Sequence, residues 1–568
     1  MTHGTAAPAV LAVRPGLTSP VPADAGRALG RARPALVFKP MFGRLSRRRR
    51  LFGLLAAAAA VPAVMLVTAG WRRAHAPRVW GPGEVPVAFW SWRTEAPAQD
   101  EVERAAAETG ARTLFLRAGQ FELKSGGVGR VRAVAGPMPR GVELHLVYNA
   151  TPRLLSEFER VDEKALAAAF AETFRADSAR AGRDGARVAG LQLDLDVPTR
   201  LLPRYRRVLR ETRFALPAGV KLSVTGLPTW MESKELSGVL AEVDFWAPQF
   251  YGAEIPATVH RIIPIASPPD VARGVARARE LGKPFYAGLA AYGQALVYDA
   301  RGRLVGLRGD LDPARVASDS SLELVGRRAF GAGVEGDGAR VGAPPPAGEW
   351  RYVFRARGDT TLEGLTLRAG EQVVLAVPGS ESLRAGVRGV REAAGDRLLG
   401  VCLFRLPTRG DATTLRLSEV KAALLDAEPE FSTRLSAGGS DEEGGAENRF
   451  VLTAENDGAG GAVYGEGALS VTLRVPRGGV RGVTGLEGFD TFETLCESGG
   501  APVPCSAARA SLVRLGARAW APGARARAGL SFEGGPPRAL EARVAARLDD
   551  GRVWERGVSV SVKGAEGR

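Results

Sequence analysis

The chain has 568 residues, more than one hydrophobic core usually holds, so we expect two to four domains. Its hydrophobic fraction of 45% is ordinary for globular protein. The formal net charge of +15 would suit a nucleic-acid partner, but residues 1–50 carry +9 of it and residues 71–568 carry only +6. Because the remainder is nearly balanced, we expect no basic surface for phosphate contacts and no nucleic-acid partner.

The first 70 residues are typical of an export signal. Residues 1–50 are Pro-rich and basic and are predicted to be disordered. Residues 51–70 are uncharged and apolar, which is long enough to span a bilayer, and the preceding positive charge places the later chain outside the cytoplasm. This segment is predicted to be a transmembrane signal anchor or a cleaved signal peptide. The protein is therefore expected to be exported, either anchored in the inner membrane or released as a periplasmic or secreted protein.

Short apolar runs alternate with segments of helical periodicity over residues 80–293 and 398–428. Strands are predicted to begin near residues 85, 111, 142, 188, 220, 243, 284 and 398. Helices are predicted over residues 99–110, 163–180, 201–213, 270–282 and 417–428, with a short one after residue 230. Eight such units predict an α/β fold, a closed (β/α)8 TIM-type barrel. A doubly wound open sheet is the alternative, although no Gly-rich phosphate loop follows the first strand.

Two further regions are predicted to be rich in β-strands. Residues 294–397 are too long for a loop and contain hairpin-like segments, so we expect a β-rich insertion before the last barrel strand. Residues 429–568 have short alternating strands separated by turn residues, which predicts a C-terminal β-sandwich. In that region Cys496 and Cys505 bracket a turn-rich loop and are expected to form a disulfide. No CxxC or Cys/His cluster is present, so we expect no structural metal and no cofactor.

Polar and aromatic residues gather at the predicted strand ends, where barrels of this type carry their chemistry. In the fourth strand, GLQLDLD places Asp194 and Asp196 on one face and the leucines on the other. Buried carboxylates are costly unless they are paired or used. The other strand ends carry Trp90, Trp92, Gln120, Glu122, Asn149, Trp230, Gln249, Tyr251 and Tyr292. Together these residues predict a cleft that suits a sugar, whose faces stack on aromatic rings while its hydroxyls form hydrogen bonds.

The segment AGLQLDLD (189–196) resembles the fourth-strand motif of the family 18 glycoside hydrolases, the chitinases, which runs Asp-Gly-x-Asp-x-Asp-x-Glu. Gly190 and Asp194 match this motif, and Asp196 stands where the family has its glutamate acid. Ala189 and Gln192 replace the two earlier aspartates.

A second stretch, APQFYG (247–252), is similar to the end of that family's sixth strand, where Gln249 and Tyr251 would contact the substrate amide. Over residues 80–430 the chain also resembles an uncharacterised bacterial family of envelope proteins, a domain of unknown function related at fold level to the glycosidase barrels.

The resemblance implies substrate-assisted hydrolysis, in which the acetamido oxygen of the substrate is the nucleophile. Asp196 would be the acid, Asp194 would raise the pKa of that acid, and Tyr251 would hold the acetamido group. Glu122 is the alternative second carboxylate. Two other interpretations of the aspartate pair stay open: a polar network with an arginine, Ser223 or Thr225, and a DxD metal site.

The expected function is that of an exported glycoside-hydrolase-like barrel acting on an envelope or extracellular glycan that is N-acetylated. The alternative is a catalytically inactive barrel that binds a glycan or a protein partner at the cell envelope. An enzyme requires an acid placed against the substrate, whereas a binding protein requires only aromatic rings and hydrogen-bonding groups.

Overall fold

The computed structural model describes residues 78–563, with gaps at 126, 253, 262, 331–348, 440–448, 476–478, 534–537 and 550–551. The basic segment 1–50 and the apolar segment 51–70 lie outside the described residues. No helix within the described ranges is long and apolar enough to cross a membrane.

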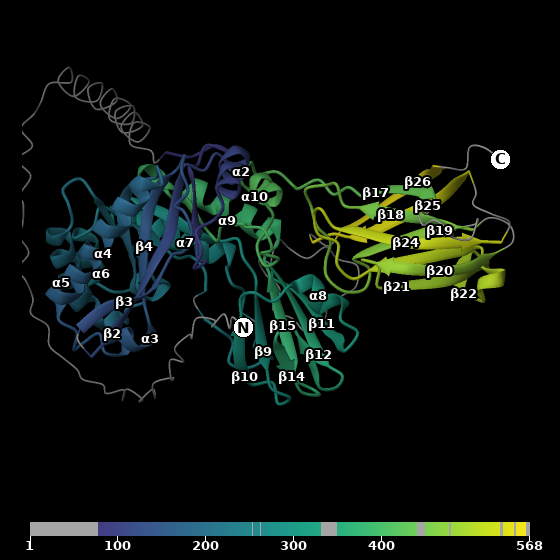
Figure 1. Cartoon of the computed structure of the whole chain (residues 1–568), viewed down its shortest axis with the longest axis horizontal. Helices are drawn as coiled ribbons and strands as arrows, with labels where there is room; N and C mark the ends of the chain where they lie inside the picture. Colours follow the sequence, from purple (N-terminus) through teal and green to yellow (C-terminus); the bar gives the residue numbers. More distant parts are fainter. Residues whose placement is uncertain are drawn as a thin grey trace, which may run out of the picture. The chain divides into compact units, whose positions relative to one another are not determined.

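A closed barrel of eight parallel strands forms the first part of the described chain (Figure 1). Its strands are β1 (Val87–Ser91), β2 (Thr113–Lys124), β4 (Glu143–Ala150), β5 (Arg187–Asp194), β6 (Lys221–Gly226), β7 (Phe245–Pro248), β8 (Phe285–Ala290) and β16 (Leu398–Phe404). Strand β1 closes the ring because it pairs in parallel with both β2 and β16. The predicted barrel is therefore confirmed, with each of the eight predicted strands in it.

Helices cover the outside of the barrel: α2 (Gln99–Thr109), α3 (Pro152–Ser156), α4 (Glu163–Arg183), α5 (Leu202–Ala215), α6 (Leu236–Ala241), α7 (Pro268–Glu280), α9 (Ser380–Ala393) and α10 (Leu417–Leu424). Helix α9 was not predicted and lies within the segment assigned to the insertion. It buries Leu383, Val387 and Val390 at helical spacing and packs against α7 and α10. It is therefore a barrel helix.

The alternation in β5 separates two environments. Leu191 and Leu193 are fully buried in the outer core between the strands and the helices. Gln192 and Asp194 point to the inside of the barrel, where the neighbouring strands contribute Phe115 and other apolar side chains. The predicted two-faced strand is confirmed, and the carboxyl group of Asp194 faces inward.

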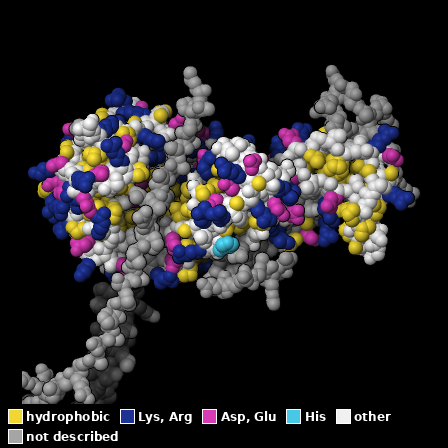
Figure 2. Space-filling model, turned by 90° about the horizontal axis from the view of Figure 1, so that it is seen from below, with side chains coloured by type: hydrophobic (Ala, Val, Ile, Leu, Met, Phe, Trp, Pro, Cys, Tyr) yellow, Lys and Arg dark blue, Asp and Glu magenta, His cyan; other side chains and the backbone are white. Residues whose placement is uncertain are grey.

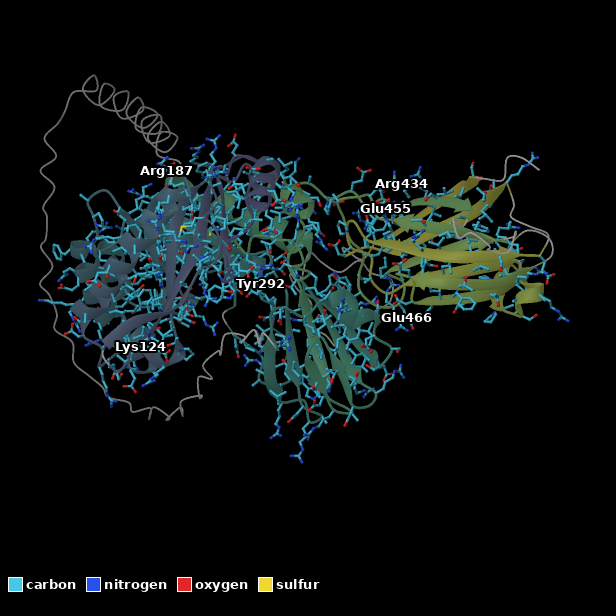
Figure 3. The ribbon with its side chains drawn as sticks, viewed as in Figure 1. Lys124, Arg187, Tyr292, Arg434, Glu455 and Glu466 are labelled. Carbon is cyan, nitrogen blue, oxygen red and sulfur yellow. A yellow bond between two sulfur atoms is a disulfide. The ribbon has the colours of Figure 1, made fainter. Side chains whose placement is uncertain are left out.

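Strand β3 (Gly127–Ala133) was not predicted and forms an antiparallel hairpin with the distal half of β2. This hairpin extends the barrel wall beyond the carboxyl ends of the other strands. Figure 3 shows its tip at Lys124 and the start of β5 at Arg187 at opposite ends of the barrel. The hairpin therefore borders the end at which the predicted site residues lie.

A five-stranded sheet lies between β8 and α9 in the sequence, in the order β10-β9-β15-β12-β11. Its elements are β9 (Gln294–Tyr298), β10 (Leu304–Arg308), α8 (Pro313–Ser318), β11 (Leu322–Phe330), β12 (Glu349–Ala356) and β15 (Gln372–Val377), with a small hairpin of β13 (Thr360–Leu362) and β14 (Leu365–Leu367). The predicted β-rich insertion before the last strand is confirmed.

The C-terminal region is a β-sandwich-like unit with its own apolar core. Its strands are β17 (Arg434–Gly439), β18 (Arg449–Glu455), β19 (Leu469–Arg474), β20 (Val480–Glu487), β21 (Thr491–Ser498), β22 (Ala501–Pro504), β23 (Leu512–Ala517), β24 (Arg525–Phe532), β25 (Ala539–Arg547) and β26 (Val553–Lys563). Cys496 and Cys505 are joined by a disulfide across the β21–β22 hairpin, with their Cα atoms 5.8 Å apart.

The surface carries both signs of charge. Figure 2 shows Lys and Arg side chains intermingled with Asp and Glu side chains over the face that it presents. This pattern agrees with the near balance of charge computed for residues 71–568.

Candidate functional site

A group of polar and aromatic side chains lies at the carboxyl ends of the barrel strands, and we call it the strand-end cluster. It comprises Trp90, Trp92, Arg117, Asn149, Asp194, Asp196, Tyr251, Tyr292 and Phe404. Seven of these residues were predicted from the sequence, and Arg117 and Phe404 were not.

The two carboxyl groups sit at the end of β5 and in the loop that follows it. Asp194 is 7% exposed, and one of its oxygens accepts a hydrogen bond of 2.7 Å from the hydroxyl of Thr225 on β6. Asp196 lies two residues further on, and its side chain is exposed. Asp196 is therefore the member of the pair that a ligand from solvent reaches first.

Burial dominates the acid–base behaviour of this pair. It raises the pKa of Asp194 to about 8, helped by the negative charge of Asp196 and opposed by Thr225 and Arg117. It also raises the pKa of Asp196 to about 6. Because the two groups interact, they titrate as a unit and hold one shared proton between about pH 6 and about pH 8.

Arg117 on β2 brings a positive charge inside the barrel. It is 9% exposed, its Nη1 donates to the carbonyl oxygen of Trp92 at 3.2 Å, and its Cζ lies 4.3 Å from the centroid of the Trp92 ring. Burial lowers its pKa, and the charge of Asp194 opposes that change. The available signal was an arginine inside the apolar run TLFLRAG, on the same strand face as Phe115.

Phe404, the last residue of β16, is the centre of the aromatic group. Its ring centroid lies 5.2 Å from that of Trp90, 5.9 Å from that of Trp92 and 5.0 Å from that of Tyr292. The ring of Tyr251 stacks on it at 5.7 Å. Trp92, Tyr292 and Phe404 keep part of their surface exposed, so they offer apolar faces next to the carboxyl pair. Figure 3 places Tyr292 where the barrel chain leads into the insertion.

Two buried polar atoms in the cluster have no hydrogen-bond partner within the described part of the chain. They are Oδ1 of Asn149, an acceptor, and Nε1 of Trp90, a donor. Asn149 lies directly opposite Asp194 in the pairing of β4 with β5. Both side chains are more than nine-tenths buried, so these two atoms lack the hydrogen bond that a buried polar atom usually forms.

Tyr251 lies close enough to Asp194 and Asp196 for their charges to raise the pKa of its phenol, after the larger effect of burial. The hydroxyl therefore stays protonated and available as a donor. Gln249, two residues before Tyr251, is partly exposed and forms an isolated parallel β-bridge with Gly288 of β8. The structure thus brings Tyr251 to the carboxyl pair and leaves Gln249 at the same barrel end.

Glu122 lies on the distal part of β2, opposite Gly129 of β3 and beyond the last pairing of β2 with β4. Gln120 is opposite Asn149 on the inward face. Glu122 is not among the groups that act on the pKa of Asp194 or of Asp196. The structure does not bring Glu122 into the pair.

Trp230 does not line the strand-end cluster, contrary to the prediction. Strand β6 ends at Gly226, and Pro228 begins a short 3₁₀ turn that carries Trp230 into the outer core. The indole is fully buried against Tyr205, and its Nε1 donates to the carbonyl of Val197 at 2.9 Å. Trp230 therefore supports the loop that carries Asp196.

Gly190, which matches the glycine of the chitinase motif, is required by packing. A Cβ at this position would lie 2.5 Å from the carbonyl oxygen of Lys221 and 2.7 Å from Nδ1 of His145. His145 is buried inside the barrel next to Phe115, and burial lowers its pKa to about 4. Beside the aspartate pair, the described residues include no third His, Cys, Asp or Glu that completes a metal site.

Comparison with solved structures finds barrels of the chitinase type at low identity. The spore cortex-lytic enzyme SleL of Bacillus cereus is 13% identical, with 60% of this chain and 74% of that chain covered and a TM-score of 0.38. A chitinase from Chromobacterium violaceum is 16% identical over 60% and 99%, with a TM-score of 0.38. A family 18 N-acetylglucosaminidase from Paenibacillus barengoltzii is 12% identical over 60% and 99%, with a TM-score of 0.37. Since these values are low, the function proposed below rests on residues of this chain.

No curated protein matches the chain. One family model does match it, over a segment that begins at the end of β4, contains both carboxyls of the strand-end cluster and ends in β11. This agrees with the resemblance to an uncharacterised family noted from the sequence: residues 149–324 match the family described as Domain of unknown function (DUF3142).

Proposed function

We propose that the strand-end cluster is the active site of a glycoside hydrolase that acts on a glycan of the cell envelope or of the surrounding medium. The observation that carries the proposal is a pair of neighbouring carboxyls beside partly exposed aromatic rings, where burial raises the pKa of both carboxyls. Protonation of a leaving oxygen requires an acid that keeps its proton, and sugar rings stack on aromatic faces.

Asp196 is the acid in this proposal because it is the exposed member of the pair. Its proton passes to the glycosidic oxygen as the bond from that oxygen to the anomeric carbon breaks. Asp194 lies behind it and is fixed by Thr225, and the charge of Asp196 raises the pKa of Asp194, which helps to keep one proton on the pair. Deprotonated Asp196 then accepts a proton from the attacking water, which restores the starting state.

An N-acetylated sugar suits the remaining groups of the cluster. Its acetamido oxygen would attack the anomeric carbon and form a cyclic intermediate, which water opens. The protonated phenol of Tyr251 would orient this acetamido group by donating a hydrogen bond. The residues that hold the substrate and the acid thus come from the end of β16 and from the segments that follow β5 and β7, at one end of the barrel.

We further propose that the protein works outside the cytoplasm, with residues 51–70 as its membrane anchor or export signal. The support is the basic cluster before an uncharged apolar segment of bilayer-spanning length.

The proposal is tested by measuring release of reducing ends by the purified full-length protein from N-acetylglucosamine polymers, peptidoglycan and other polysaccharides. Turnover should follow a bell-shaped pH profile with limbs near pH 6 and pH 8, because one proton must be on the pair. Asp196→Asn should lower kcat by about 10²-fold or more, because proton transfer contributes about that much. Asp396→Asn, the same change at an exposed site before β16, is the matched control.

Loss of activity in both variants, or equal activity in the parent and in Asp196→Asn, would contradict the assignment of the acid. Retention on an immobilised glycan without turnover would instead identify a glycan-binding barrel. Binding without turnover is the outcome that the short side chain of Asp196 favours. Compared with a glutamate at this position, the aspartate displaces the acidic proton by about 1.5 Å. Asp196→Glu separates the two cases: a gain of turnover in this variant identifies a barrel whose acid is too short.

A further inference from the structure

The positive charge of Arg117 has no carboxylate partner. Within the described ranges, no Asp or Glu lies within ion-pair distance of this guanidinium, although the side chain is nine-tenths buried. Its contacts are the face of the Trp92 ring and the carbonyl of the same residue. Asp194, whose charge acts on Arg117 from beyond ion-pair distance, offsets the burial of this guanidinium only in part, because burial still lowers the pKa of Arg117.

A second arginine reaches the same side through an irregularity in β3. Arg132 pairs with Gln120 and Arg130 pairs with Phe121, so one extra residue, Val131, separates the two pairs. This bulge turns Arg130 and Arg132 to opposite faces of the hairpin. Arg130 binds Asp177 on the outer side, whereas Arg132 shares the inward face with Gln120.

The strand register then forms a continuous row on the inward face. Arg132 lies opposite Gln120, Gln120 lies opposite Asn149, and Asn149 lies opposite Asp194. Arg132 is exposed, and its charge acts on Arg117, which lies one step below Gln120 on β2. Cations therefore occupy the β2–β3 side of the cluster, and the two carboxyls occupy the β5 side.

The hairpin that carries Arg132 is held in place by buried contacts. Arg130 makes two hydrogen bonds to Asp177 of α4, at 2.8 and 2.7 Å, and the hydroxyl of Tyr148 donates to the same carboxylate at 2.8 Å. Beyond β3, Ala135 and Thr94 are joined by a backbone hydrogen bond of 2.8 Å, which fixes the loop that follows Trp92. The position of Arg132 relative to Arg117 is thus set by the fold.

We propose that Arg117 and Arg132 form a carboxylate-binding subsite, so that the preferred glycan carries an acidic sugar next to the bond that is broken. The inference rests on the proposed function in placing the glycan at the strand-end cluster. The sugar carboxylate would supply the ion pair that Arg117 does not form with Asp194, and Gln120 and Asn149 lie between it and the acid pair. A uronic acid and a sugar with a lactyl ether supply the same group.

A competing role for Arg117 is to position Asp194, whose pKa it lowers. That role predicts a changed pH profile in an Arg117 variant but no preference for acidic over neutral glycans. The role of Arg132 separates the two interpretations. Its charge is exposed, and it lies on β3, which reaches β5 only through β2 and β4. Discrimination between acidic and neutral ligands is therefore the decisive measurement.

The test measures binding by calorimetry to the full-length protein with two pairs of probes. The first pair is hyaluronan octasaccharide and its carboxyl-reduced form, and the second is peptide-free glycan strands with free lactyl carboxylates and their carboxyl-reduced form. At least one acidic probe should bind roughly tenfold or more tightly than its reduced form, as a charge-assisted hydrogen bond predicts. The pair that shows the preference distinguishes a uronic acid from a lactyl ether.

The ratio of affinities for the acidic and the reduced probe should fall toward one in Arg117→Gln and should decrease in Arg132→Gln. Because Arg132→Gln alters only an exposed side chain, the test stays valid if the buried Arg117→Gln change prevents folding. Arg112→Gln, the same change at the other end of β2, should keep the preference. Equal binding of acidic and reduced probes, no binding of any probe, or a preference that survives in both subsite variants overturns the inference. A preference without hydrolysis would contradict the proposed hydrolase while the subsite stands.

Discussion

Two buried aspartates of the barrel, Asp177 and Asp194, sit in opposite environments. Asp177, in the outer layer, accepts two hydrogen bonds from Arg130 and one from Tyr148. Asp194, inside the barrel, accepts one from Thr225 and faces a second carboxyl, Asp196. The outer carboxylate is neutralised by its partners and joins a helix to a hairpin. The inner one is left near a like charge, which costs stability and keeps a proton available, as a reactive site requires.

The largest effect on stability is expected from Asp177→Ala. The change leaves Arg130 and the buried hydroxyl of Tyr148 without their acceptor, which should lower the free energy of unfolding by about 3 kcal/mol. Urea unfolding followed by tryptophan fluorescence measures it. Activity per folded molecule on neutral glycans should be retained, since Asp177 holds the hairpin that carries Arg132 and does not contact the carboxyl pair. If the Asp177→Ala variant kept the parental stability but lacked activity, Asp177 would belong to the reactive site and would not be a structural carboxylate.

Asp194→Asn should instead stabilise the protein at alkaline pH. The pKa of Asp194 is about 8 in the folded state and near 3.8 when unfolded, so between these values the folded state binds more protons and stability falls as pH rises. The limit is about 1.4 kcal/mol per pH unit, and we expect a parental loss of about 2 kcal/mol between pH 5 and pH 8. Unfolding at both pH values should show a smaller loss in the variant. An unchanged slope would mean that Asp194 ionises normally.

Trp230→Phe tests the contact between the outer core, where Trp230 lies, and the loop that carries Asp196. The change removes the hydrogen bond to the carbonyl of Val197 while it keeps an aromatic ring in the outer core. We expect a loss of about 1 kcal/mol in unfolding free energy and a lower kcat with little change in KM, because the loop beyond Asp196 loses its support. A change in KM alone would point to direct ligand contact, which the burial of the indole contradicts.

The smallest effect is expected from Arg434→Gln in the β-sandwich. Arg434 and Glu455 form an exposed ion pair of 2.9 Å, which Figure 3 labels. Glu455 keeps a second partner in Arg525, so the loss should be below about 0.5 kcal/mol. This variant sets the baseline for the unfolding measurements. A larger loss of unfolding free energy would show that exposed ion pairs of the β-sandwich contribute more to stability than expected.

Much of the barrel could be predicted because its signals are local. The period-two alternation of β5 already assigned the leucines to the outer core and the aspartates to the inside, and Thr225 was among the predicted partners of the pair. Tyr251, Tyr292, Trp90 and Trp92 were located because aromatic residues at strand ends converge once a barrel is assumed.

What the sequence did not reveal depends on contacts between distant segments. Arg117 looks like any strand residue until the closure of the barrel places it near Asp194, and Phe404 gains its role from rings on three other elements. Trp230 was misplaced because the strand was extended through Pro228. The arginine-rich hairpin strand β3 has no apolar periodicity, so its pairing with β2 could not be read from residues 127–133.

The way the insertion leaves and rejoins the barrel has a consequence for folding. Its first strand, β9, and its last, β15, are hydrogen-bonded neighbours, with Gln294 opposite Ala376. The chain therefore departs from β8 and returns to α9 at almost the same place. Once this sheet has formed, the barrel closes across a connection that is effectively as short as a hairpin, and the entropy of joining β16 to β8 is reduced. Early folding of the insertion should thus accelerate closure of the ring, and a short turn in its place would preserve the same route.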